Sequence, residues 1–166
     1  IKFYHDTLVC YSYSKSLSMP GERIGYVLIS PQANRMDKLI AAVGGSARSM
    51  GYICAPSLMQ RVVAMNQGVT SDLEAYDKNR QMIYDIVTKY GFDAVRPEGA
   101  FYLFVKSPSG DGKEFSERAK KYELLLVPSD SFGIEGYVRI SYCVSKEQIE
   151  KSEAAFRALA KDYGLI

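Results

Sequence analysis

A lysine among small hydroxylated residues, followed by an arginine, is the group in this sequence best suited to chemistry. Ser12 and Ser14 precede Lys15, and Arg23 follows it with a glycine, Gly25, two positions further on. A lysine amine can form a Schiff base with an aldehyde. A guanidinium can hold two phosphate oxygens at once, and serine hydroxyls can donate to the same phosphate. The run therefore predicts a site for a cofactor that carries both an aldehyde and a phosphate group.

The run resembles the signature of class I aminotransferases of the aspartate aminotransferase type, which are fold type I enzymes that use pyridoxal 5'-phosphate. The small residues before Lys15 and the triplet Arg23-Ile24-Gly25 carry the resemblance. It implies that Lys15 is the catalytic residue, which forms the Schiff base and then moves a proton at the substrate Cα. It also implies that Ser12, Ser14 and Arg23 bind the phosphate. Partial burial of Lys15 would favour the neutral amine. The alternative, a solvated lysine in a serine-rich loop, explains a lone Ser-x-Ser-Lys but leaves Arg23 and the glycines unexplained.

Arg139 is the second candidate, and it lies on a predicted strand. Val138 and Ile140 alternate to one face, so Arg139 takes the face turned to a cleft or to solvent. The aminotransferases place the arginine for the substrate α-carboxylate on a strand of this kind, after a Val-Pro…Phe-Gly segment that residues 127–133 represent here. The resemblance therefore implies that Arg139 binds the carboxylate of an amino acid or a 2-oxo acid. The alternative is an ordinary surface ion pair.

Two further positions bear on the same comparison. In the aspartate enzymes a second arginine, donated across the dimer interface, binds the distal carboxylate of the substrate, and Arg48 is the candidate for that role. Arg48 can equally be a helix-end residue that satisfies backbone carbonyls. Ser129 is a departure, because the family commonly has glycine there. A serine would be strained if the backbone needed a positive φ.

The elements that must position these residues can be predicted from caps, turns and periodicity. Strands are expected on both sides of Lys15, at residues 7–11 and 23–29, and a helix from Ser30-Pro31 to the glycine pair at 44–45. Capping boxes predict further helices from Ser57, from Ser71 to about residue 90, and from Ser145. Short strands at 94–95, 101–105, 124–127 and 137–142 and a helix at 112–121 complete the expected order.

The alternation of helices and strands predicts an α/β chain. By resemblance, residues 1–80 are the C-terminal segment of a large domain that binds pyridoxal phosphate, and residues 81–166 are a small α+β C-terminal domain. The sequence opens with Ile1, close to the strand that leads to Lys15. We therefore expect the C-terminal part of a longer, homodimeric enzyme, with little or no activity in this chain alone.

Composition excludes several other classes of protein. The 166 residues are 47% hydrophobic with a net charge of +2, which gives no reason to expect nucleic acid as a partner. No apolar run reaches the roughly 18 residues of a membrane span, so no membrane association is expected. The three cysteines are far apart and there is one histidine, which suggests neither a disulfide framework nor a metal site. Reduced thiols favour a cytoplasmic protein.

Three functions remain open at this stage. The first is amino transfer between an amino acid, possibly aspartate, and a 2-oxo acid. The second keeps the cofactor but performs β-elimination or decarboxylation, since one fold can host several reactions. The third is a non-catalytic fragment or an effector-binding module.

Overall fold

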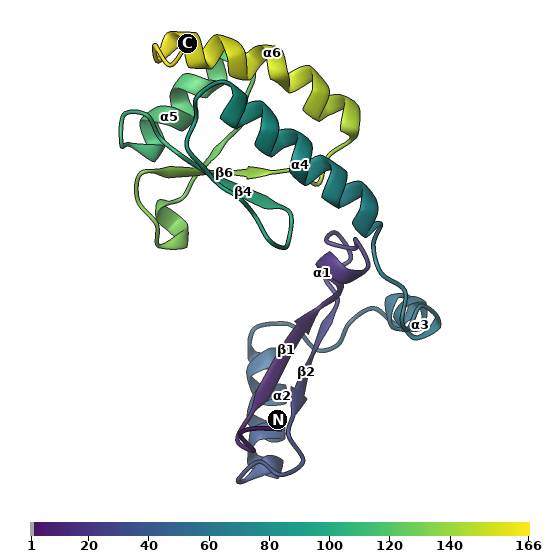
Figure 1. The fold of residues 1–166 in the computed structure, drawn as a ribbon. Helices are drawn as coiled ribbons and strands as arrows, with labels where there is room; N and C mark the ends of the chain where they lie inside the picture. Colours follow the sequence, from purple (N-terminus) through teal and green to yellow (C-terminus); the bar gives the residue numbers. More distant parts are fainter. Residues whose placement is uncertain (1) are drawn as a thin grey trace. The chain divides into compact units, whose positions relative to one another are not determined.

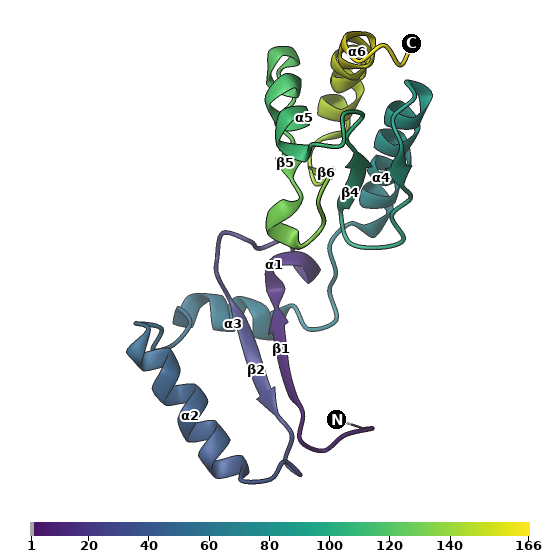
Figure 2. The same ribbon diagram turned by 90° about the vertical axis from the view of Figure 1, so that its left-hand side faces the viewer.

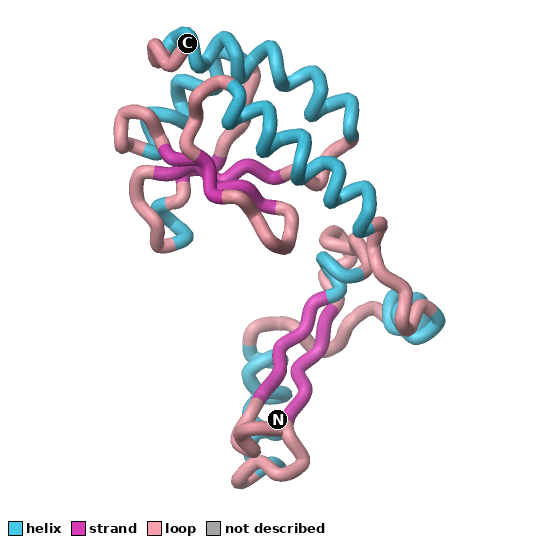
Figure 3. The backbone as a smooth tube through the Cα atoms, viewed as in Figure 1, coloured by secondary structure: helices cyan, strands magenta, loops and turns pink. Residues whose placement is uncertain are grey.

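The structure, a computed structural model, describes residues 2–166. The chain divides into two compact units between Ser71 and Asp72, each with its own architecture (Figure 1). Figure 3 shows that both units contain helices and strands. This division is one of contacts within the chain. The domain boundary expected near residue 80 concerns the longer enzyme and stays a prediction.

The first unit is built on a two-stranded antiparallel sheet. Its strands pair from Leu8 with Ile29 to Ser12 with Gly25, which confirms the two strands expected on either side of Lys15 to within two residues. A single helical turn follows the first strand, and two longer helices follow the second. The elements are β1 (Leu8–Ser12), α1 (Tyr13–Ser16), β2 (Gly25–Ile29), α2 (Met36–Ser49) and α3 (Ser57–Met65).

Helix α2 begins and ends later than the sequence predicts. Ser30 is buried, and its Oγ accepts a hydrogen bond from the backbone N–H two residues later, which closes a turn instead of capping a helix. Arg35 then adopts a left-handed conformation, and the helix begins only at Met36. The glycine pair at 44–45 lies inside the helix, which reaches Ser49. Glycine makes a helix interior less stable but does not end it.

The second unit is a two-layer α+β structure. Its four-stranded antiparallel sheet has the order β3-β4-β6-β5, and the three helices lie on one side of it (Figure 1, Figure 2). The strands are β3 (Ala94–Val95), β4 (Tyr102–Lys106), β5 (Val127–Pro128) and β6 (Tyr137–Ser141). The helices are α4 (Leu73–Lys89), α5 (Gly112–Ala119) and α6 (Lys146–Asp162), with short 3-10 helices η1 (Lys120–Tyr122) and η2 (Asp130–Phe132).

Alternation along the two central strands separates the core from the free face of this sheet. Leu103 and Val105 of β4 and Val138 of β6 are buried against the helices. The residues between them, including Tyr102 and Arg139, take the opposite face. The sheet therefore presents Arg139 on the side away from the core, as its strand pattern predicted.

The described helices can be compared with the length and apolar character of a membrane span. No helix in residues 2–166 combines the length and the apolar character that crossing a membrane would require.

Candidate active site

The first group of candidate residues lies on the helical turn that follows β1. Ser12 caps this turn, since its Oγ accepts a hydrogen bond of 3.2 Å from the backbone N–H of Ser14. The same hydroxyl donates to Ser14 Oγ at 2.9 Å. Lys15 is on this turn, next to the two hydroxyl groups. One helical turn thus carries the lysine and both serines of the predicted site.

Arg23 reaches the same end of the sheet from the other strand. The backbone N–H of Tyr13 donates to the carbonyl of Ile24 at 3.1 Å, one step beyond the last strand pair. Arg23, the preceding residue, has a left-handed backbone with φ of 53°. Such a conformation costs a non-glycine residue about 1–2 kcal/mol. Its Nη1 donates to the carbonyl of Pro20 at 2.9 Å, and a guanidinium has further N–H donors for an anion.

Gly25, the last residue of the Arg-aliphatic-Gly triplet, is required by the close approach of the two strands. A Cβ at this position would lie 2.3 Å from the carbonyl oxygen of Tyr11, which is backbone and cannot turn away. A Cβ at Gly21, by contrast, would meet no atom within 4 Å. The structure therefore gives a packing reason for Gly25 and none for Gly21.

The residues of this turn fit a phosphate-bearing aldehyde. The Lys15 amine can hold the aldehyde, and Ser12, Ser14 and Arg23 supply donors for the phosphate. Ser16, the next residue, has a buried hydroxyl oxygen without a hydrogen-bond partner among residues 2–166. An unsatisfied buried hydroxyl is costly, and the Ser16 hydroxyl is an unused polar group on the turn that carries Lys15.

The expected partial burial of Lys15 is wrong for this chain, in which the residue is exposed. Its turn is four residues long and stands at the end of a two-stranded sheet. No residue of this turn is fully buried.

Arg139 belongs to the second unit, where its environment sets it apart from other arginines. Three arginines of the described chain are half-buried: Arg80, Arg118 and Arg139. Arg80 pairs with Asp77 at 2.6 Å, and Arg118 pairs with Glu114 at 2.7 Å. No carboxylate within residues 2–166 pairs with Arg139, which packs on aromatic rings instead. Among residues 2–166 the surface ion pair considered from the sequence is therefore absent, and the guanidinium can donate to an external carboxylate.

The loop that precedes β6 resolves the departure at Ser129. Its φ is −87°, so the serine is not strained. The left-handed residues of this loop are Gly133, with φ of 81°, and Gly136, with φ of 77°. Glycine is thus used where the positive φ occurs.

Arg48 lies on a different element, in the last turn of α2, and its side chain is exposed. The structure thus brings Ser12, Ser14 and Lys15 onto one turn with Arg23 beside it, and it places Arg48 and Arg139 on other elements. Sequence reasoning missed the rings that contact Arg139. The strand alternation that exposed Arg139 could have placed Tyr102 on the same face, once the pairing of β4 with β6 was known.

Comparison with known proteins matches the chain to a protein family. The profile described as aminotransferase class I and II matches residues 1–156. The chain belongs to this family. Its relatives are aminotransferases that depend on pyridoxal phosphate.

Individual aminotransferases resemble the chain over most of its length. An aromatic-amino-acid aminotransferase of Thermococcus litoralis is 28% identical over 98% of this chain, and an aspartate aminotransferase of Pyrococcus horikoshii is 32% identical over 90% of it. A solved amino transferase of Eubacterium rectale superposes with a TM-score of 0.88 and 50% identity over 98% of the chain.

The same comparisons fix how much of each relative the chain represents. It spans 43% of the Thermococcus protein, 40% of the Pyrococcus protein and 41% of the Eubacterium chain. The α/β chain therefore matches a part of the aminotransferase fold.

Proposed function

We propose that this chain is the C-terminal part of a pyridoxal-phosphate-dependent aminotransferase, which transfers an amino group between an amino acid and a 2-oxo acid. The observation that supports this most directly is the convergence of Lys15, Ser12, Ser14 and Arg23 at one end of the β1–β2 sheet. A lysine amine, two hydroxyls and a guanidinium are groups that can hold the aldehyde and the phosphate of such a cofactor. Residues 1–80 would belong to the large domain and residues 81–166 to the small domain.

The roles of the first group follow from their chemistry. The Lys15 amine would hold the cofactor and move a proton at the substrate Cα. Ser12, Ser14 and Arg23 would anchor the phosphate and so fix the orientation of the ring. Pyridoxal phosphate, when bound, supplies an electron sink that stabilises negative charge at Cα.

The two remaining arginines would bind substrate. Arg139, half-buried and unpaired with any carboxylate of residues 2–166, would hold the α-carboxylate through two parallel hydrogen bonds. Arg48 would reach the distal carboxylate of a dicarboxylic substrate such as aspartate, from the second subunit of a homodimer. The named relatives include aspartate and aromatic-amino-acid aminotransferases, which favours transfer over elimination or decarboxylation. A cytoplasmic location fits this assignment.

Trapping of the cofactor tests the assignment of Lys15. The full-length enzyme is incubated with pyridoxal phosphate, reduced with borohydride and mapped by peptide mass spectrometry. We expect one adduct, on Lys15, which is lost in Lys15→Ala and retained in Lys38→Ala, the variant of an exposed lysine on α2. An adduct on another lysine, or none, would contradict the proposal.

Activity measurements test the transfer itself. With a panel of amino donors and a 2-oxo acid, the full-length enzyme is expected to form a new amino acid and a new 2-oxo acid. The 166-residue chain alone is expected to show little or no turnover. Release of ammonia without a new amino acid would indicate elimination instead.

A further inference from the structure

The guanidinium of Arg139 is held by two aromatic rings that come from different segments. Its Cζ lies 4.2 Å from the ring centre of Tyr102 and 4.0 Å from the ring centre of Phe132. The positive guanidinium is attracted to the electron-rich faces of such rings. Contact with rings from two separate segments favours the observed orientation of the side chain over others.

The two rings are positioned in different ways. Tyr102 is fixed by the sheet, since β4 pairs with β6 and places Tyr102 opposite Ser141 on the face that carries Arg139. Phe132 is outside the sheet, in the loop that joins β5 to β6. Its ring can stay over Arg139 only if this loop has one conformation.

Ser129 fixes the conformation of that loop. It is fully buried, and its backbone N–H donates to the carbonyl of Tyr137 at 3.0 Å. Its hydroxyl proton is shared between the carbonyls of Tyr137, at 2.8 Å, and Ile134. The backbone N–H of Phe132 donates to the carbonyl of Ser129 at 2.8 Å. The hydroxyl thus joins both ends of the segment that carries the Phe132 ring.

We propose that Ser129 and Phe132 are positioning residues that preset the Arg139 guanidinium for the substrate carboxylate. Glycine, which aminotransferases of this type commonly have here, could make the backbone bonds but not the two bonds of the hydroxyl. This inference rests on the proposed role of Arg139. The guanidinium does not have to be ordered when substrate arrives, so less conformational entropy is lost on binding. The effect belongs to binding of the carboxylate and not to proton transfer at Cα.

The test compares four single variants of the full-length holoenzyme, one of them Arg139→Lys, and the double variant Ser129→Ala/Phe132→Leu. Ser129→Ala removes the hydroxyl, and Phe132→Leu removes one ring; the Phe132 side chain is 44% exposed, so its replacement opens no core cavity. Ser131→Ala, an exposed serine of the same loop, is the matched control. KM and kcat are measured for the best amino donor. Kd is measured for the carboxylic acid that has the same skeleton but no amino group, which binds without reacting.

Loss of the Phe132 ring, or of the hydroxyl that positions it, is expected to weaken carboxylate binding and to leave the later steps unchanged. For Ser129→Ala and Phe132→Leu we expect KM and Kd to rise about three- to tenfold, with kcat within about twofold. Ser131→Ala should match the wild type. Because Ser129 acts through Phe132, the double variant should bind the carboxylate no more weakly than Phe132→Leu alone.

Arg139→Lys separates failure of this inference from failure of the proposed function. If Arg139→Lys raises KM while Ser129→Ala and Phe132→Leu leave it unchanged, the positioning role is wrong and the role of Arg139 stands. If Arg139→Lys has no effect on KM, the role of Arg139 itself is wrong. Additive effects in the double variant would show that Ser129 does not act through Phe132 and would overturn the proposal.

Discussion

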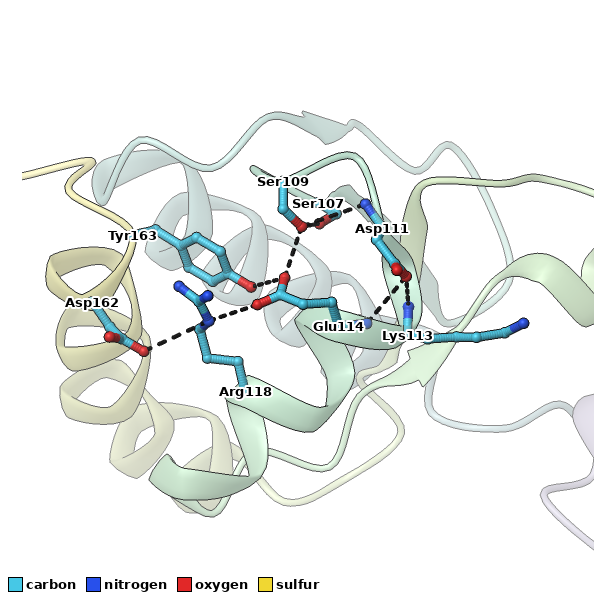
Figure 4. A network of polar contacts seen from close by, with 8 residues as sticks. All are labelled: Ser107, Ser109, Asp111, Lys113, Glu114, Arg118, Asp162 and Tyr163. Carbon is cyan, nitrogen blue, oxygen red and sulfur yellow. Dashed lines mark hydrogen bonds and ion pairs between the residues drawn. The ribbon is translucent and has the colours of Figure 1, made fainter.

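At the scale of single residues, Glu114 shows how neighbouring groups set the charge state of a side chain. Its carboxylate accepts hydrogen bonds of 2.7 Å from Ser109 and from the Tyr163 hydroxyl, and it pairs with Arg118 (Figure 4). Burial raises the pKa of Glu114, but the two hydrogen bonds and the charge of Arg118 outweigh it, so the pKa is lowered overall. Burial and the bond to Glu114 raise the pKa of Tyr163.

The lowered pKa of Glu114 predicts a contribution to stability that acid removes. Because the folded chain holds the ionised form, this contribution is complete above the ordinary pKa of a glutamate and is lost as pH falls through the lower folded value. Glu114→Gln is expected to lower the free energy of unfolding by about 1–2 kcal/mol at pH 7, and by much less at pH 3. Urea unfolding of the chain, followed by circular dichroism, measures both values.

Glu117→Gln is the matched control for this prediction. Glu117 is on the same helix, but it is exposed and pairs with Lys120, which is also exposed. Its replacement is expected to change the free energy of unfolding by less than about 0.5 kcal/mol. An equal loss at both pH values for Glu114→Gln would contradict the titration argument.

At the scale of elements, helix starts show what local sequence can and cannot predict. The capping box at Ser145 is confirmed, with Ser145 and Gln148 bonded to each other's backbone N–H. The box predicted at Ser71 is wrong, because Asp72 caps α4 by accepting from Ala75. The backbone N–H of Ser71 instead donates to the carbonyl of Ser16, 55 positions earlier. A competing long-range bond of this kind leaves no trace in the local pattern.

The residues of the candidate site also differ in whether local sequence could predict their contacts. Lys15 and Arg23 could be found from sequence because their partners lie within a few residues and one strand pair. The rings around Arg139 could not, because Tyr102 reaches it through sheet register and Phe132 through a loop closed by Ser129. Register and loop closure depend on contacts between distant segments, which composition and spacing do not specify.

The sheet of the first unit yields a second prediction. Gly25→Ala would place a methyl group 2.3 Å from the Tyr11 carbonyl oxygen, so the two strands must separate at the end that carries Lys15. Overpacking of this kind costs typically about 1–3 kcal/mol. In the full-length enzyme we expect weaker trapping of pyridoxal phosphate on Lys15 and a lower melting temperature. Gly21→Ala, which meets no atom within 4 Å, should behave as the wild type; equal behaviour of the two variants would refute the packing argument.

At the scale of the whole molecule, the two units bury very different amounts of apolar surface. Among the described residues of the first unit, Ile24, Ala33 and Val63 are the buried apolar side chains, and α2 buries none. Many of its apolar side chains are exposed, including Tyr26, Val27 and Leu28 along β2. The second unit has one continuous core from Ile83 to Ala160. Burial of apolar surface is the main favourable term in folding, so the second unit should be the more stable.

This difference predicts that residues 72–166 fold without the rest of the chain, whereas residues 1–71 do not. The two segments are expressed separately, and their unfolding in urea is followed by circular dichroism. We expect one cooperative transition for residues 72–166. For residues 1–71 we expect no cooperative transition, together with strong binding of a dye for exposed apolar surface.

A core variant checks that the transition reports on this packing. Phe115 is fully buried between helix and sheet, so Phe115→Ala should lower the free energy of unfolding of residues 72–166 by about 3–5 kcal/mol. Val95→Ala removes an exposed side chain of the same unit and should have little effect. A transition in residues 1–71 as sharp as that of residues 72–166 would show that exposed apolar area does not decide which part of this chain folds alone.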